Sequence, residues 1–121
     1  MEKGKVYDLE ARTRLYALAV RVFVKSLPMS LGNREDAKQV VRSSGSIGAN
    51  YIETNESLGK KDFLMRIRIS RKEAKETIYW LSLLDTEQKE DLEATRAFLS
   101  QEGTELMRIF GAILTKSTVT S

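Results

Sequence analysis

The chain has 121 residues, a length that fits a single domain with a hydrophobic core of its own. It contains no cysteine and no histidine, which excludes disulfide bonds, thiolate metal sites and the commonest general base. The net charge is only +3, but residues 60–75 hold seven basic and two acidic residues, whereas residues 76–121 hold four basic and eight acidic ones. No apolar run reaches the roughly 20 residues needed to span a membrane, and the N-terminus lacks the apolar region of a secretion signal, so we expect a cytoplasmic protein without membrane contact.

Four segments have the apolar spacing of amphipathic helices, at about residues 8–26, 33–57, 60–84 and 87–115. In the first segment, Asp8 is a plausible N-cap and Pro28 bars continuation. The apolar residues at helical spacing there are Leu15, Tyr16, Leu18, Ala19, Val22 and Phe23. In the second segment, Asn33 is the predicted N-cap and Gly59 the left-handed residue that ends the helix.

The third and fourth segments carry heptad patterns. The third has a seam with alternating steps of four and three residues: Phe63, Ile67, Ser70, Ala74, Thr77, Leu81 and Leu84. The fourth follows a predicted capping box at Asp85 and Gln88 and repeats every seven residues: Leu92, Leu99, Leu106 and Ile113. Helices of this length joined by short loops predict an all-α, up-down-up-down antiparallel four-helix bundle that fills residues 1–121 as one domain.

The stretch RSSGSIGANYIE (Arg42–Glu53) has the glycines and serines of a phosphate-binding loop. Such a loop needs a preceding strand and usually a following lysine, and neither is present. The flanking apolar residues keep helical phase through the stretch, so we favour small residues where another helix comes close, namely Ser44, Gly48 and, with less force, Gly45. The polar residues within the seams, such as Ser70 and Thr77, are expected to form local hydrogen bonds.

Catalysis and metal binding have little support in the sequence. Glu53 and Glu56, and again Glu73 and Glu76, have the i,i+3 spacing of carboxylates in di-metal bundles. Those sites also require Glu-x-x-His ligands, and three of these glutamates fall off the apolar seams of their helices. We therefore expect ion pairing, with no metal site, no cofactor and no catalytic residues.

A basic stripe on the third segment is the candidate binding site. Its cations fall within about 100° on a helical projection, roughly opposite the heptad seam, with Tyr79 at the end of the same arc. In nucleic-acid binding, the cations would contact phosphates and Tyr79 would stack on a base. There are two alternatives. The stripe could mediate self-assembly against the acidic C-terminal third, or it could be a solvated face with ion pairs such as Lys72–Glu76. The candidate nucleic-acid-binding residues are Lys61, Arg68, Arg71, Lys72, Lys75 and Tyr79.

The same region resembles a known family. RSSGSIGANYIE, followed by KKDF and KEAKETIYWLSLL, is similar to the signature of the bacterial four-helix-bundle proteins, also called 23S rRNA intervening-sequence proteins. The first helix resembles the family as well, and the likeness runs from about Asp8 to Leu114. The positions that match the signature, and that we assign to packing or interfaces, are Arg42, Ser43, Ser44, Ser46, Ile47, Ala49, Asn50, Glu53, Phe63, Glu73 and Glu76, together with Lys61, Asp62 and Lys72.

The resemblance implies an assembly and a class of partner. Family members are similar to the accessory variability protein of diversity-generating retroelements, a basic pentamer that engages a reverse transcriptase and nucleic acid. The resemblance therefore implies that this chain forms a homo-oligomer, with a pentamer as the leading form, and that it has no catalytic residues. We expect a non-catalytic oligomeric bundle that binds RNA or a ribonucleoprotein partner through the basic stripe. The alternative is a structural adaptor ring that binds a protein partner without touching nucleic acid.

Overall fold

A computed structural model describes residues 8–119 of the chain. Within this range it forms α2 (Leu9–Lys25), α3 (Leu31–Ile52), α4 (Lys60–Leu83) and α5 (Glu90–Val119), with a short 3-10 helix, η1 (Glu53–Glu56), and no strand. The predicted all-α class is confirmed. The predicted domain also took in residues 1–7, 120 and 121, which lie outside the described residues.

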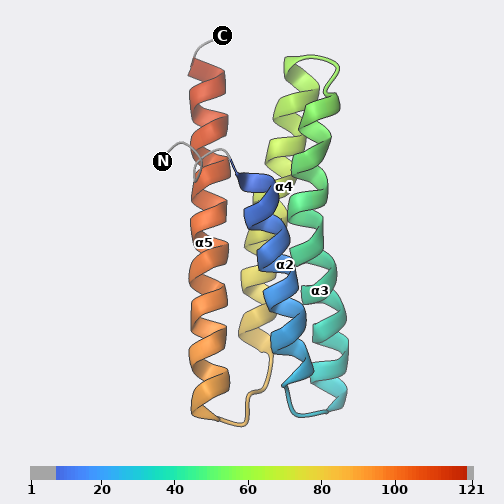
Figure 1. Ribbon diagram of the computed structural model, residues 1–121, viewed down its shortest axis with the longest axis vertical. Helices are drawn as coiled ribbons and strands as arrows, with labels where there is room; N and C mark the ends of the chain where they lie inside the picture. The colour runs from blue at the N-terminus through green and yellow to red at the C-terminus, as the bar shows by residue number, and fades with distance from the viewer. Residues whose placement is uncertain (1–7, 120–121) are drawn as a thin grey trace.

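Successive helices run antiparallel, joined by loops at alternating ends of the bundle (Figure 1). Hydrogen bonds between α3 and α4 show the direction, because residue numbers rise on one helix as they fall on the other. The hydroxyls of Ser43 and Thr77 lie 2.8 Å apart, and one turn further along, the Ser70 hydroxyl donates to the Ile47 carbonyl at 2.9 Å. The sequence predicts local hydrogen bonds for the seam residues Ser70 and Thr77. Thr77 does donate to the Glu73 carbonyl of its own helix at 2.8 Å, but the Ser70 bond and the Thr77–Ser43 contact join neighbouring helices.

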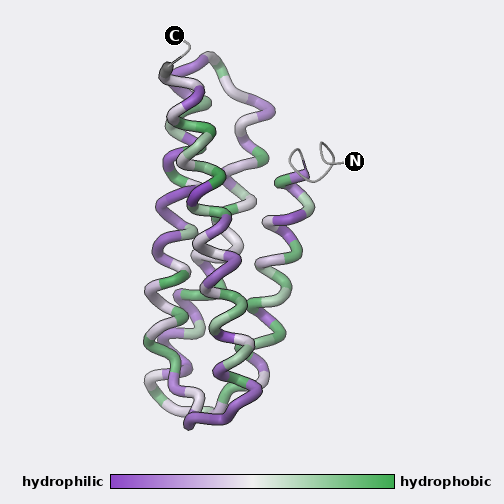
Figure 2. The backbone as a smooth tube through the Cα atoms, turned by 90° about the vertical axis from the view of Figure 1, so that its left-hand side faces the viewer, coloured by the Kyte–Doolittle hydropathy of each residue, from purple (hydrophilic) through white to green (hydrophobic). Residues whose placement is uncertain are grey.

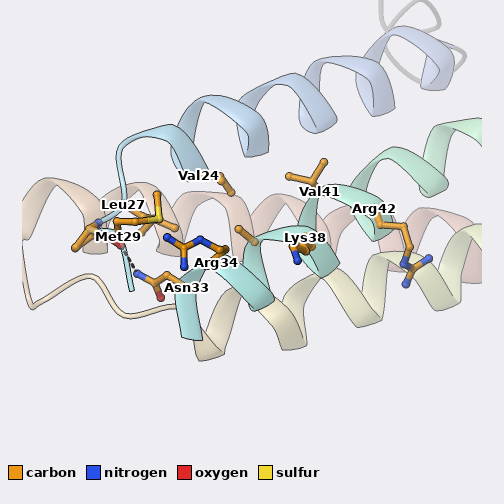
Figure 3. A pocket seen from close by; sticks show the side chains of 10 residues that line it. Val24, Leu27, Met29, Asn33, Arg34, Lys38, Val41 and Arg42 are labelled. Carbon is orange, nitrogen blue, oxygen red and sulfur yellow. Dashed lines mark hydrogen bonds between the residues drawn. The ribbon is translucent and has the colours of Figure 1, made fainter. Parts of the chain in front are cut away.

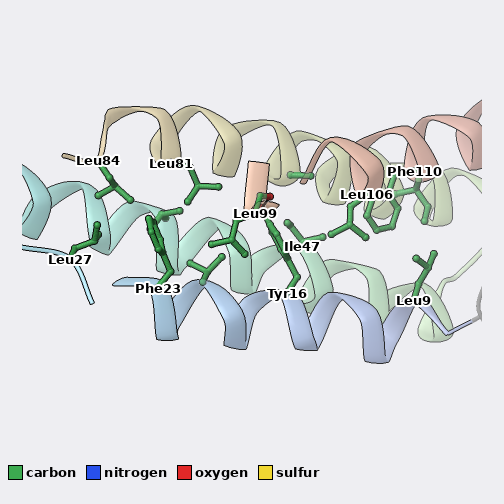
Figure 4. Close-up of a cluster of buried hydrophobic side chains, with 14 of the residues drawn as sticks. Leu9, Tyr16, Phe23, Leu27, Ile47, Leu81, Leu84, Leu99, Leu106 and Phe110 are labelled. Atoms are coloured by element: carbon green, nitrogen blue, oxygen red, sulfur yellow. Dashed lines mark hydrogen bonds between the residues drawn. The ribbon is translucent and has the colours of Figure 1, made fainter. Parts of the chain in front are cut away.

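One hydrophobic core runs along the bundle between the four helices (Figure 4). The predicted seam of α4 faces it: five of its residues, Ile67 to Leu81, are fully buried, Leu84 is 2% exposed and Phe63 is partly buried. Leu92, Leu99 and Leu106 of α5 are buried as predicted, and Figure 2 shows apolar segments interleaved with polar ones along each helix. None of the described helices is long and apolar enough to cross a membrane.

The predicted cap of α3 is wrong. Ser30 is the N-cap, and its hydroxyl accepts the Asn33 N–H at 3.0 Å. Asn33 is instead buried inside the helix, where its amide nitrogen donates to the carbonyls of Pro28 and Asp85 and its oxygen accepts the Asp85 N–H at 2.8 Å. Asn33 thus joins the α2–α3 loop to the α4–α5 loop, a long-range role that a capping pattern does not reveal.

Two other predicted boundaries also need correction. The second helix ends at Ile52 and tightens into η1, and Gly59, with φ of +132°, directly precedes α4 instead of ending α3. The fourth helix begins at Glu90 and not at residue 87, because Glu87 and Gln88 have left-handed φ angles of 56° and 62°. The predicted capping box is an Asx turn, in which Asp85 accepts the Glu87 N–H at 2.8 Å.

The apolar residues predicted for the first helix divide between two faces. Tyr16 and Phe23 are buried, together with Leu9, Thr13 and Val20. Leu15, Leu18 and Val22 are exposed, at 63%, 41% and 65%. The helix therefore has an apolar face that the isolated bundle leaves uncovered.

Gly48 lies at a close contact between α2 and α3. A Cβ atom there would lie 2.7 Å from the Thr13 hydroxyl oxygen, whereas a Cβ atom at Gly45 would meet only the Arg21 guanidinium, at an ordinary 3.5 Å. Both glycines lie inside the continuous helix α3. The glycine-serine stretch therefore packs helices, as expected for Gly48, and does not form a loop around phosphate.

Candidate nucleic-acid interface

Four of the predicted binding residues line one groove between α4 and α5. Arg68, Arg71, Lys72 and Lys75 project from α4, and the groove has a volume of about 510 Å³. All four side chains are exposed. They lie on the flank of α4 that adjoins α5 and not, as the helical projection suggested, on the side opposite the seam. We call this feature the basic groove.

α5 completes the basic groove with three residues that the sequence analysis did not select. Arg108 adds a fifth cation, and Met107 and Gly111 line the groove beside it. Gly111 leaves Arg71 room, because a Cβ atom built there would lie 3.7 Å from an Arg71 guanidinium nitrogen. These residues belong to the acidic C-terminal third, so only the packing of α5 against α4 reveals them.

The groove cations of α4 are not paired with carboxylates of the described residues. None of Arg68, Arg71, Lys72 and Lys75 forms an ion pair with another described residue, and Arg108 makes only a long contact of 3.9 Å with Glu105. The Lys72–Glu76 pair of the solvated-face alternative is absent among the described residues, and Glu76 instead lies 3.5 Å from Arg42. Like charges crowded along a concave surface raise its positive potential, and this potential favours a polyanion.

Lys61 and Tyr79 lie outside the groove. Both are exposed, Lys61 near the start of α4 and Tyr79 near its end, with 58% of Tyr79 accessible. Tyr79 packs edge-on against Trp80, with ring centroids 5.2 Å apart. The structure therefore brings together four of the six predicted residues and leaves these two on extensions of the same helix.

The signature residues meet in an ion cluster between α3 and α4. Arg42 lies 3.6 Å from Glu73 and 3.5 Å from Glu76. The ion pairing expected of Glu73 is thus present, at the contact of two helices; its side chain is buried, with the residue 9% exposed, and its Oε1 atom has no hydrogen-bond donor among the described residues. Burial raises the pKa of Glu73, Arg42 opposes the rise, and Glu76 adds to it.

The other signature residues mostly serve packing and helix contacts. Ser43, Ser44 and Ile47 are fully buried, and the Asn50 side-chain oxygen accepts a hydrogen bond from Arg66 at 3.0 Å. Ser46, which the Asn50 amide contacts, and Phe63 are partly buried, whereas Ala49 and Glu53 are exposed. The signature thus describes the α3–α4 contact more than the basic groove.

The predicted carboxylates do not form a metal centre. No group of three or more Asp, Glu, His or Cys side chains in residues 8–119 is arranged to hold a metal ion. Glu53 and Glu56 lie exposed on η1, and Glu73 and Glu76 pair with Arg42 on α3. The geometry of the described residues thus assigns these side chains no ligand.

Comparison with known proteins identifies the family. The family model of the 23S rRNA-intervening sequence protein matches residues 7–110, which is most of the chain. The chain belongs to this family. No curated protein matches it.

A solved member of the family has the same fold. It is a protein of unknown function from the S23 ribosomal protein family of Bacteroides thetaiotaomicron, with 26% sequence identity and a TM-score of 0.70. The match covers 87% of this chain and 96% of the solved one. Neither the family description nor that of the solved relative names a catalytic activity.

Proposed function

We propose that the chain is a non-catalytic, self-associating protein of the cytoplasm that binds RNA, or an RNA–protein assembly, through the basic groove. The observation that carries this proposal is the set of four α4 cations that line one groove without an ion pair to any residue in the range 8–119, with Arg108 on the α5 side of the groove. Cations of this kind neutralise backbone phosphates, and the release of counterions then drives binding.

The groove supports binding of the phosphate backbone more than reading of base sequence. Its lining offers long cationic side chains and one methionine, without asparagine or glutamine to read base edges. Tyr79, one turn beyond Lys75, is placed to stack on a base at the end of the contact, and Lys61 extends the cationic row at the other end. We therefore expect high affinity for RNA at low salt and little sequence preference.

Binding and charge reversal together test the proposal. The protein should copurify with nucleic acid, seen in the 260/280 nm absorbance ratio and identified by sequencing. Arg68→Glu with Lys72→Glu should abolish binding of a fluorescent RNA hairpin, while Arg14→Glu with Lys25→Glu, which changes the net charge equally on exposed sites of α2, should retain most of it. Absence of binding by the wild type at about 50 mM salt would contradict the proposal.

A protein-binding adaptor ring is the second candidate function. Met65 and Tyr79 are exposed at 45% and 58% beside the cations, a combination that suits a protein interface as well as a nucleic acid. In either case we propose that the chain self-associates, with a pentamer as the leading form. Light scattering after size-exclusion chromatography tests this, since a monomer at about 100 μM would exclude a stable ring.

A further inference from the structure

A second groove, between α2 and α3, is apolar and has a basic rim (Figure 3). Its volume is about 530 Å³, and its floor includes Val24 and Leu27 from the end of α2 and its loop and Ala37 and Val41 from α3. Arg34 and Lys38, one turn apart on α3, line the same groove. Arg34 forms no ion pair within the described residues, and Lys38 has only an exposed one, 3.3 Å from Glu35.

An exposed aromatic ridge on α5 has the opposite character. Phe98 is 68% exposed, and Asp91 and Glu105 lie seven residues before and after it. A spacing of seven residues keeps the three side chains on one side of the helix, about 10 Å apart along its axis. Glu105 accepts a hydrogen bond from the neighbouring Gln101 amide at 2.9 Å and lies 3.9 Å from Arg108. The Asp91 side chain has no hydrogen bond or ion pair among the described residues.

Leu15 of α2 widens this ridge. Arg12 and Glu102 form an ion pair of 2.7 Å between α2 and α5, and the Tyr16 hydroxyl donates to the Leu99 carbonyl at 2.9 Å. Leu15 lies three residues from Arg12, and Phe98 lies four residues from Glu102, so both continue the faces that meet at the ion pair. This register places Leu15 and Phe98 at about the same level of the bundle, and both are exposed.

We propose that the ridge of one copy docks in the apolar groove of a second copy. Phe98 would enter the groove near Ala37 and Val41, and Asp91 or Glu105 would then approach Arg34 and Lys38. The cations of the groove rim are about 6 Å apart along α3, so long side chains can reach the acids on either side of the ring. The occupant is assigned by this complementarity: an apolar groove with a basic rim matches an aromatic ridge with acidic flanks.

The two surfaces lie on different flanks of α2, one toward α3 and the other toward α5. Contact between them is heterologous, so a pair of copies retains a free groove on one copy and a free ridge on the other. Such contacts form a ring when the rotation between copies closes. This inference rests on the self-association in the proposed function and assigns the surfaces that meet.

Charge exchange tests the pairing in the full chain. Arg34→Glu with Lys38→Glu should weaken association about tenfold or more by light scattering, and adding Asp91→Lys with Glu105→Lys in the same chain should restore the wild-type mass. Phe98→Ser should also lower the mass, whereas Leu58→Ser, at a 94% exposed leucine outside both surfaces, should not. An assembly whose mass none of these variants changes would overturn the pairing while leaving self-association intact.

Disulfide trapping supplies an independent test, because the chain has no cysteine of its own. Chains with Lys38→Cys mixed with chains with Ala94→Cys should form a mixed disulfide dimer under mild oxidation, since Ala94 lies one turn from Phe98. Leu58→Cys mixed with Ala94→Cys should not. Equal cross-linking in both mixtures would overturn the pairing of groove and ridge. A monomeric wild type would also overturn it, because the pairing requires self-association. RNA binding is measured separately for each variant, so that the two proposals are tested independently.

Discussion

Gly48 of α3 faces Thr13 of α2 so closely that a Cβ atom on the glycine would lie 2.7 Å from the threonine hydroxyl oxygen. Thr13 is 1% exposed, and its hydroxyl donates to the Leu9 carbonyl at 2.8 Å. The threonine therefore has little freedom to turn away. The missing side chain at Gly48 lets the first two helices of the bundle come into contact.

Replacing Gly48 with alanine should lower the free energy of unfolding by about 1–3 kcal/mol, because the added methyl group forces α2 and α3 apart. Gly45→Ala is the matched control on the same helix. Its methyl group meets only the flexible Arg21 side chain at 3.5 Å, so better helix propensity should raise stability by up to about 1 kcal/mol. Urea denaturation measures both, and equal effects of the two substitutions would contradict close packing at Gly48.

The buried hydroxyl pair between α3 and α4 should contribute to stability. Thr77→Val keeps the shape of the side chain but removes the partner that lies 2.8 Å from the Ser43 hydroxyl. The Ser43 hydroxyl would keep a 3.5 Å contact with the Val40 carbonyl, and the Glu73 carbonyl would lose the Thr77 donor. Because buried polar groups that lose hydrogen bonds destabilise the folded state, we expect a loss of about 1–3 kcal/mol in the free energy of unfolding.

The control for this substitution is Thr95→Val. Thr95 is exposed and donates only to the Asp91 carbonyl of its own helix, so its effect should stay within about 0.5 kcal/mol. If thermal or urea unfolding finds Thr77→Val as mild as Thr95→Val, the hydroxyl pair does not hold α3 to α4.

The pH dependence of stability should report the buried carboxylate. Burial raises the pKa of Glu73 in the folded state above its unfolded value. The folded protein therefore binds a proton more tightly, and the wild type loses stability as the pH rises from the unfolded pKa to the folded one. Glu73→Gln does not titrate there, so it should melt a few degrees above the wild type at pH 7.

This advantage of Glu73→Gln should shrink as the pH falls from the raised folded-state pKa of Glu73 toward its unfolded pKa, because the wild-type carboxyl then becomes neutral. Glu76→Gln is the control, because Glu76 also faces Arg42 but is more exposed, with 38% of its side chain accessible against 11% for Glu73. If Glu73→Gln lowers the melting temperature at every pH, then the attraction between Glu73 and Arg42 outweighs the cost of burying the carboxylate.

The heptad patterns made the helices and their buried faces predictable from the sequence. On α4, apolar and small residues at steps of four and three face the core, because the periodicity of a helix is a local property of the sequence. The boundaries depended on contacts between distant residues. Asn33 resembles an N-cap by type, but its side chain bonds to the backbone of Asp85, 52 residues away. Glu87 and Gln88 adopt left-handed φ angles, but neither is a glycine, so the residue types did not indicate a turn there.

The candidate binding site was predictable on one helix only. The cations of α4 follow from charge and helical spacing, and the structure gathers four of them in one groove. Arg108 was missed because it lies in the acidic C-terminal third of the sequence. Only the packing of α5 against α4 shows that it lines the same groove as the cations of α4. The exposed Leu15 was missed for a related reason: α2 has apolar residues on two faces, and the sequence alone does not say which face the bundle covers.

Tyr79 should contribute to RNA affinity if the bound strand extends along α4. Tyr79→Ala should weaken RNA binding by about 1–3 kcal/mol through the loss of stacking, whereas Tyr79→Phe, which keeps the aromatic face, should retain affinity. Fluorescence anisotropy with a single-stranded RNA measures both. Equal losses for alanine and phenylalanine would instead assign the effect to the hydroxyl group.

The salt dependence of RNA binding tests the central claim most directly. For wild type, Arg68→Gln with Lys72→Gln, and the control Arg14→Gln with Lys25→Gln, the association constant is measured by anisotropy between about 50 and 200 mM salt. If the basic groove holds phosphates, the groove variant should bind more weakly and the slope of log K against log salt should fall in magnitude by about 1.5, while the control keeps the wild-type slope. Identical slopes for all three proteins, or no binding at the lowest salt, would contradict the assignment of the basic groove to RNA.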